Sequence, residues 1–299
     1  MADNNFVKAS VLSALSSMFF ALFILLVLKV EYTEFAFFIS SFVLFVFSFV
    51  IIKLNKSKVF LPTKSSVATA ILFSLSMILY LYFMSSKNVI VLQAIVSLSI
   101  IVFVAIHTIR HKDIIDSSAI KFLVGGMIFI VYSLFLFYDF SSVFRSLSFL
   151  IISLIIMLLF GFSSYMMSHR IKHTRNKFNF LLWISLVSVI MSSFSILLTF
   201  PTKITQHDIL YSLIASIFFI IFLVSLVEGY DKIKEYTGKS RFSKTIIVSI
   251  LSETDILFIS LFYAIFIGTI NFYVILGALL LFIGLVLISF IHKERDLVI

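Results

Sequence analysis

The stretch LFSLSMILYLYFMSSKNVIVLQAIVSLSIIVFV, residues 72–104, decides the fold class. It consists of two strongly apolar runs on either side of the short polar turn SSKN, and neither run alternates apolar and polar residues. A helix needs about 20 apolar residues to cross a bilayer core of roughly 30 Å. The strands of a membrane barrel are only about 10 residues long and alternate in polarity. The stretch therefore predicts a hairpin of two membrane-spanning helices.

The composition extends this interpretation to the whole chain. Hydrophobic residues fill 62% of the 299 positions and charged residues 12%, and the mean hydropathy is +1.20. A soluble domain carries roughly 25% charged residues, so this chain lacks the polar surface that a water-soluble body needs. The net charge of +9 gathers at the ends of the apolar runs, which indicates membrane topology rather than nucleic-acid binding. The absence of cysteine excludes disulfides and thiol chemistry.

Apolar runs of this kind recur along the chain and predict an all-α membrane protein with ten transmembrane helices. With the N-terminus in the cytoplasm, the cytoplasmic gaps hold 19 of the 23 Lys and Arg residues and the outer gaps hold 4. This bias puts both termini in the cytoplasm, and we expect a multi-pass protein of a bacterial-type inner (plasma) membrane. The predicted spans are 6–30, 33–54, 65–86, 88–109, 119–140, 144–168, 178–200, 208–228, 245–270 and 271–292.

An internal repeat is suggested by two of these spans. KFLVGGMIFIVYSL, from Lys121, aligns with YVILGALLLFIGLVL, from Tyr273, so that Gly125 matches Gly277 at an offset of 152 residues. Each segment is the fifth helix of a five-helix half, residues 1–142 and 143–299. Five is an odd number, so the second half would enter the membrane from the opposite side, as in transporters with inverted repeats. The alternative is a chance likeness between two apolar helices.

With these features the chain resembles the EamA-like branch of the drug/metabolite transporter superfamily. The resemblance rests on the ten-helix plan, on residues 72–104, on SILSETDILFISLFYAIFIGTINFYVILGALLLFIGLVL at 249–287, and on Gly125 and Gly277. It covers nearly the whole chain and implies a secondary transporter that works by alternating access. The substrate would be a small metabolite, such as an amino acid or a nucleotide-like or drug-like molecule.

Several positions depart from the pattern of that family. Its members often have a proline in helices 4 and 9, where Ser99 and Thr254 stand here. They often have a glutamate before helix 10, where this chain has Thr269, and an arginine in helix 2, where residues 40–45 are SSFVLF. These departures leave the substrate class open.

Glu253 and Asp255 are the acids placed well inside a predicted span. A helix over 245–270 puts them about 7 and 4 Å to the cytoplasmic side of its midpoint. An ionised carboxylate at this depth costs several kcal/mol, and such residues usually face a cavity or pathway. Either acid could couple transport to protons or receive a cationic group of the substrate. The alternatives are a structural acid bonded to Ser, Thr or Tyr, or a helix shifted toward the cytoplasm.

Other polar residues in the spans are candidate substrate contacts. The resemblance implies that helices 3, 4, 8 and 9 line the cavity. Each such side chain could equally make a hydrogen bond between packed helices. The candidates are Gln93, Ser97, Ser99, Tyr80, Tyr82, Tyr211 and Tyr263.

Glycines in the fifth and tenth spans indicate close helix packing. They are Gly125, Gly126, Gly277 and Gly284, and the last two are seven residues apart and so share a helix face. That face could pack within the chain or in a homodimer. His169 and His173 have the spacing of two metal ligands but no third ligand, so we expect no metal or other cofactor.

The sequence therefore predicts a transporter whose partners are the bilayer, a small substrate and, if an acid titrates, protons. Two other functions stay open. An integral-membrane enzyme acting on lipid-linked substrates would need a cluster such as Asp113 and Asp116 near His111, and the chain could also be a non-transporting scaffold. We expect no enzymatic activity.

Overall fold

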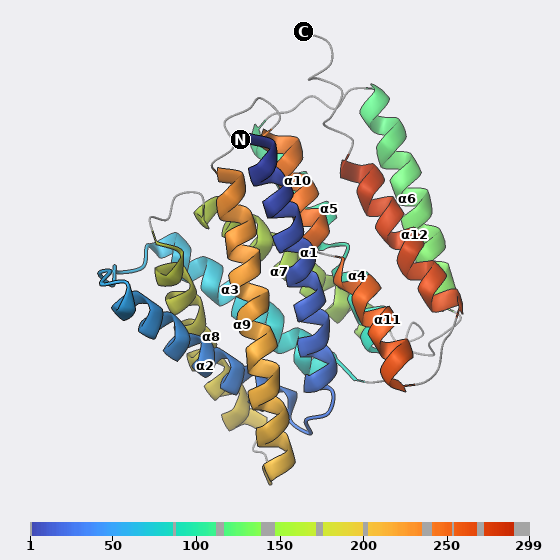
Figure 1. The fold of residues 1–299 in the computed structure, drawn as a ribbon. Coiled ribbons are helices and arrows are strands. Elements are labelled where there is room, and N and C mark those ends of the chain that lie inside the picture. The colour runs from blue at the N-terminus through green and yellow to red at the C-terminus, as the bar shows by residue number, and fades with distance from the viewer. Residues whose placement is uncertain are drawn as a thin grey trace.

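A computed structural model describes residues 2–85, 88–111, 117–138, 147–171, 176–199, 203–234, 241–252, 254–267 and 272–289. Within these ranges the chain is all-helical and has no strand. Figure 1 shows the helices packed side by side in a bundle. Their bounds are α1 (Ala2–Val27), α2 (Thr33–Leu54), α3 (Lys64–Phe83), α4 (Val89–Val96), α5 (Ser99–His111), α6 (Ser117–Tyr138), α7 (Leu147–Ile171), α8 (Lys177–Thr199), α9 (Gln206–Lys234), α10 (Arg241–Ser252), α11 (Asp255–Ile267) and α12 (Phe272–Ser289).

Seven helical stretches in the described part of the chain are long and apolar enough to cross a membrane. Shorter apolar helices cover Val124–Leu134 and Phe272–Ile288. Large hydrophobic side chains stay exposed on the outer faces of these helices, as expected where the surrounding solvent is lipid. The seven stretches are Asn4–Val27, Thr33–Leu54, Lys64–Phe83, Val89–Ile106, Leu147–Ile171, Lys177–Thr199 and Gln206–Ile233, of which Val89–Ile106 comprises α4 and the first part of α5.

The centre of the bundle is built by helices that are distant in the sequence. Helix α1 packs along α9, and α3 packs along α7. The rings of Phe20 and Phe222 are 4.8 Å apart and those of Phe23 and Phe219 are 5.0 Å apart. Because one residue number rises as the other falls, α1 and α9 run antiparallel (Figure 1).

A second layer joins α2 to α8 and α9, and α8 to α3. Buried serines mark two of these contacts. Ser40 in α2 accepts a hydrogen bond of 3.3 Å from Ser216 in α9, and Ser74 in α3 shares one of 2.7 Å with Ser188 in α8. Hydrogen bonds of this kind between membrane helices are worth about 0.6 kcal/mol each on average.

Helices α6 and α12 pack on each other at one edge of the bundle (Figure 1). A Cβ atom on Gly126 would lie 2.7 Å from the Gly284 carbonyl oxygen, and a Cβ on Gly284 would lie 2.7 Å from the Gly126 oxygen. Ser133 donates a 2.7 Å hydrogen bond to the Gly277 oxygen in the same interface. Gly125 is looser, since a Cβ there would meet only Leu287, at 4.0 Å. The glycines that face each other are therefore Gly126 and Gly284, whereas the sequence alignment matches Gly125 with Gly277.

Two predicted spans are interrupted. The expected continuous helix over 88–109 is instead α4 and α5, and the one over 245–270 is instead α10 and α11. Helix α4 ends at Val96, and helix α10 ends at Ser252. Interruptions in membrane helices free backbone groups, which must then find partners in protein or in a cavity.

Candidate functional site

The two interrupted helices meet in the middle of the bundle. Helix α4 contacts α11, and α5 contacts α10. Both also contact a long helix, since α7 packs on α4 and α5 while α1 packs on α10 and α11. The interruptions in the two spans therefore lie close to each other.

A tight turn separates α4 from α5. Ser97 N–H donates to the Gln93 oxygen at 2.8 Å, and Leu98 N–H donates to the Ile95 oxygen at 3.1 Å, three residues back. Helix α7 comes close at this turn, because a Cβ on Gly161 would lie 2.7 Å from the Ser99 oxygen. Serine hydroxyls compete for backbone groups and so favour the ends of helices over their interiors.

Near the interruption between α10 and α11, side-chain hydroxyls bond a backbone carbonyl group. The Leu251 oxygen, near the end of α10, accepts hydrogen bonds from Ser17 Oγ of α1 at 2.6 Å and from Thr254 Oγ1 at 2.8 Å. Asp255 is the first residue of α11. The positive end of a helix dipole favours a carboxylate there. The interruption thus places an acid at a helix N-terminus, which a continuous helix would not do.

A buried polar cluster forms where these ends meet, from Tyr80, Gln93, Ser97 and Asp255. Tyr80 Oη donates to Gln93 Oε1 at 2.6 Å, and Gln93 and Ser97 face the Asp255 carboxylate at hydrogen-bonding range. Each of the four side chains is at least nine-tenths buried. The cluster combines one acid, one amide and two hydroxyls.

The cluster is incompletely satisfied. Gln93 Nε2, Ser97 Oγ and Asp255 Oδ1 have no hydrogen bond of normal geometry, and neither has the neighbouring Ser99 Oγ. A buried polar group without a partner costs about 1–3 kcal/mol. Asp255 forms no salt bridge with any residue in the described ranges. A carboxylate oxygen beside neutral donors that do not reach normal hydrogen-bond geometry is suited to a polar guest that completes their bonds.

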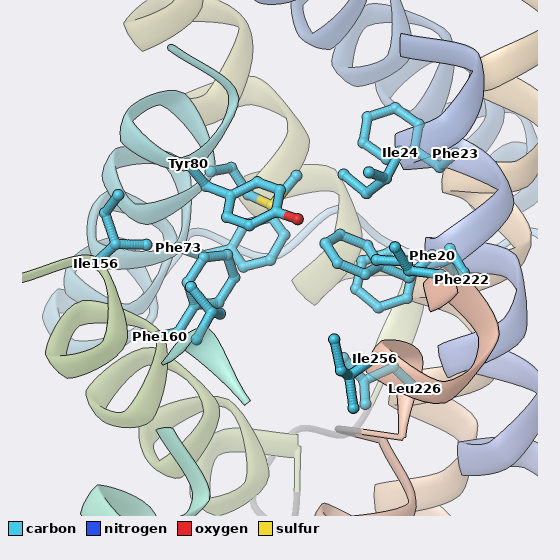
Figure 2. Close-up of a cluster of buried hydrophobic side chains, with 14 of the residues drawn as sticks. Phe20, Phe23, Ile24, Phe73, Tyr80, Ile156, Phe160, Phe222, Leu226 and Ile256 are labelled. Carbon is cyan, nitrogen blue, oxygen red and sulfur yellow. The ribbon is translucent and has the colours of Figure 1, made fainter. Parts of the chain in front are cut away.

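Aromatic and aliphatic side chains surround this cluster. The Tyr80 ring lies 6.2 Å from Phe20 of α1 and 6.0 Å, edge-on, from Phe160 of α7. Figure 2 shows the Tyr80 hydroxyl directed away from Phe160 and toward the side of the cluster that holds Phe20 and Phe222. Ile256, next to Asp255, lies on that same side (Figure 2). Apolar walls with a few convergent polar groups are typical of small-molecule sites.

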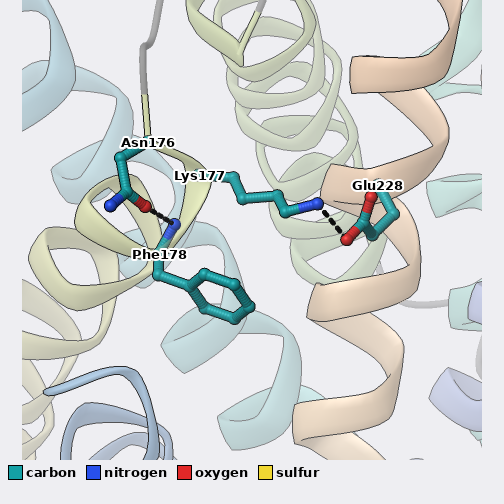
Figure 3. Close-up of polar contacts among 4 residues, drawn as sticks. All are labelled: Asn176, Lys177, Phe178 and Glu228. Carbon is teal, nitrogen blue, oxygen red and sulfur yellow. Dashed lines mark hydrogen bonds and ion pairs between the residues drawn. The ribbon is translucent and has the colours of Figure 1, made fainter. Parts of the chain in front are cut away.

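A different acid is paired. Lys177, at the start of α8, forms an ion pair with Glu228 of α9, and Asn176 Oδ1 accepts a 2.9 Å hydrogen bond from Phe178 N–H (Figure 3). Both charged side chains are about a quarter exposed. Pairs of this kind contribute at most about 1 kcal/mol. The sequence analysis did not identify this pair, because nothing in the spacing of Lys177 and Glu228 shows that they meet.

The other candidate residues lie apart from the cluster. Tyr82 is 59% exposed on the far side of α3. Tyr211 packs its ring 4.4 Å from His207 near the start of α9, and Tyr263 is half-buried two turns beyond Asp255 in α11. Glu253 lies outside the described residues, as do Asp113 and Asp116.

Compared with protein-family models and with curated protein sequences, the chain matches none. The function must therefore be inferred from the site itself.

The Tyr80 hydroxyl should stabilise the cluster measurably. We expect Tyr80→Phe to lower the free energy of unfolding by about 1–3 kcal/mol, because Gln93 Oε1 then loses its donor in a buried setting. Tyr82→Phe is the matched control on the same helix and should change nothing, since that side chain is mostly exposed. Melting temperatures of the two purified variants in one detergent give the comparison, and equal values would contradict a structural role for this bond.

Proposed function

We propose that the protein is a secondary transporter of a small polar or amphipathic metabolite, working by alternating access. The observation that carries this proposal is the buried, incompletely bonded cluster of Gln93, Ser97 and Asp255 where two interrupted helices meet. In transporters, discontinuous helices near the bilayer midplane form substrate and coupling-ion sites. Alternating access would expose this cluster first to one side of the membrane and then to the other.

We also propose the ten-span architecture with two inverted five-helix repeats, 1–142 and 143–299. Counting α4 with α5 and α10 with α11 as single spans, and adding α6 and α12, gives ten. This division is supported by the position of the interruptions. In each half the fourth span is the interrupted one, formed by α4 and α5 in the first half and by α10 and α11 in the second.

The packing supports the repeat as well. In the two halves, α1, α2 and α3 correspond to α7, α8 and α9. The contact of α1 with α9 therefore corresponds to the contact of α7 with α3, and both contacts are present. In the same way, the hydrogen bond between serines of α2 and α9 corresponds to the hydrogen bond between serines of α8 and α3. The contact of α6 with α12 joins the fifth helices of the two halves, so the same correspondence maps this pair of helices onto itself.

Chain direction supports inversion. Helix α1 runs antiparallel to α9 by its ring contacts. Helices α7, α8 and α9 follow one another through connections of a few residues, so that neighbours alternate in direction and α7 runs parallel to α9. It follows that α1 and α7, the first helices of the two halves, run in opposite directions.

Asp255 gives the transporter its coupling chemistry in this proposal. A carboxylate without an ion partner among the described residues can take up a proton or bind a cationic group of the substrate. These features suit a member of the drug/metabolite transporter superfamily, in which we place the chain as a proposal. The basic residues favour cytoplasmic termini in an inner (plasma) membrane.

A ligand screen followed by a flux assay tests the function. Purified protein is melted in the presence of amino acids, nucleotides, sugars and cationic drugs, because a ligand of the folded state raises the melting temperature. Compounds that do so are then offered to proteoliposomes with and without a pH gradient. Saturable uptake supports the proposal. Stabilising compounds that are never transported, or that are chemically converted by the protein, would refute it.

A further inference from the structure

We propose that an anionic phospholipid binds in a cavity at the end of the bundle where the connection between α2 and α3 meets α7 and α8. The cavity has a volume of about 370 Å³. Nothing in the transport proposal requires it, and the cluster at Asp255 lies elsewhere. Its lining is Phe60, Leu61, Pro62, Thr63, Ser66, Arg170, Asn176, Asn179, Phe180 and Trp183.

The wall of the cavity is held in place by long-range hydrogen bonds. The Asn179 side chain of α8 makes two hydrogen bonds with the α2–α3 connection. It accepts one from Phe60 N–H at 3.2 Å and donates one to the Lys58 backbone oxygen at 3.0 Å. Trp183 Nε1 donates to the Phe60 oxygen at 2.9 Å. The connection is thus fixed to α8, and the cavity is already formed before a ligand enters, which lowers the cost of binding.

Part of the lining is polar and basic. Arg170, in the last turn of α7, donates from Nε to Ser65 Oγ. Thr63 Oγ1 caps α3 by accepting from Ser66 N–H at 3.2 Å. Among the described residues of the lining, Arg170 is the one cation and none is acidic, and Lys58 and Lys64 lie close to lining residues in the sequence. A guanidinium matches the geometry of a phosphate group and binds it with charge-assisted hydrogen bonds.

Another part of the lining is apolar and exposed. Phe60 is 52% exposed and Leu61 is 88% exposed, and the adjacent Val59 is 45% exposed. Water is a poor solvent for three large hydrophobic residues in a row, whereas acyl chains are not. A free phosphate ion would use only the basic part. A phospholipid would place its phosphate at Arg170 and the start of its acyl chains along Phe60 and Leu61.

Trp183 makes the proposal directly testable, because it is the only tryptophan in the chain and it lines the cavity. Protein is reconstituted with phosphatidylglycerol or phosphatidylcholine carrying bromine on the acyl carbons nearest the glycerol, diluted in unlabelled phosphatidylcholine. Bromine quenches tryptophan fluorescence only at short range. We expect phosphatidylglycerol to quench Trp183 at lower mole fractions than phosphatidylcholine.

Two variants assign this preference to the cavity. Arg170→Gln should reduce the preference for phosphatidylglycerol about fivefold, the effect of one cation near a lipid surface, and Arg170→Lys should lose less. Lys53→Gln removes the same charge from an exposed lysine outside the lining and should leave the preference intact. If a variant fails to fold, quenching of Trp183 by the two lipids in the wild-type protein still tests the proposal.

Three outcomes would overturn the proposal. Equal quenching by both lipids would make Trp183 an ordinary interfacial residue. Equal loss of preference in Arg170→Gln and Lys53→Gln would indicate diffuse attraction by the basic surface. Displacement of brominated lipid by millimolar inorganic phosphate, with the same dependence on Arg170, would show that the ligand is a soluble phosphate.

Discussion

Asp255→Asn is expected to reduce substrate accumulation in proteoliposomes by about a hundredfold, the scale expected when one partner of a buried charged contact is removed. The amide keeps the shape of the carboxylate but can neither carry a proton nor balance a cationic substrate group. The buried acid is also costly to the fold, so its neutral replacement should leave the melting temperature unchanged or raise it. Loss of uptake without loss of stability is the combined result that the proposal predicts.

A matched control for this variant is Asp231→Asn, which removes an acid from α9 outside the cluster. It should retain uptake. If Asp255→Asn instead lowers the melting temperature and leaves uptake intact, Asp255 is a structural acid. The same assay on Glu253→Gln tests the second acid, whose replacement should abolish proton-driven accumulation while counterflow survives if Glu253 is the coupling group.

Gly126→Ala should destabilise the protein by about 1–3 kcal/mol, the usual cost of overfilling a packed interface. The added methyl group would lie 2.7 Å from the Gly284 oxygen and from Ile288 Cγ1. A backbone oxygen cannot move aside alone, so α6 and α12 would have to separate. Melting of the purified variant in detergent measures the effect.

The neighbouring residue provides the control for this substitution. Gly125→Ala adds the same methyl group to the same helix where the nearest atom is 4.0 Å away. It should be neutral or stabilise the helix by up to about 1 kcal/mol, because alanine loses less backbone entropy than glycine. If both variants melt alike, the close approach of α6 and α12 is refuted.

The helical membrane fold could be predicted because lipid offers no hydrogen-bond partners, so backbone groups must pair with each other within helices. Apolar length alone locates α1, α2, α3, α7 and α8 to within four residues, whereas α9 continues six residues beyond its predicted end. The interruptions in the fourth and ninth spans could not be found in that way, since the apolar signal runs on through them. A signal was present in the residue types, because Ser97 and Ser99 and the segment SETD at 252–255 are common at helix ends.

The residues of the candidate site could be predicted from the sequence, but their proximity could not. Tyr80, Gln93, Ser97 and Asp255 could be chosen as polar residues within apolar runs, but no spacing rule shows that α4 meets α11. Helical geometry could have separated Tyr80 from Tyr82, because residues two apart point about 200° away from each other. Which of two adjacent glycines touches α12 depends on the rotation of α6, which packing alone determines.

The most direct test of a pathway through the interrupted helices uses the natural lack of cysteine. A Ser97→Cys variant replaces one small buried side chain with another, and Ser133→Cys is the control in the α6–α12 interface. Both are treated with a membrane-impermeant thiol reagent in right-side-out and in inverted vesicles. If the pathway opens alternately to the two sides, the thiol at position 97 reacts from both sides of the membrane and the one at position 133 from neither. A thiol at position 97 that reacts from one side only, or not at all, would contradict such a pathway.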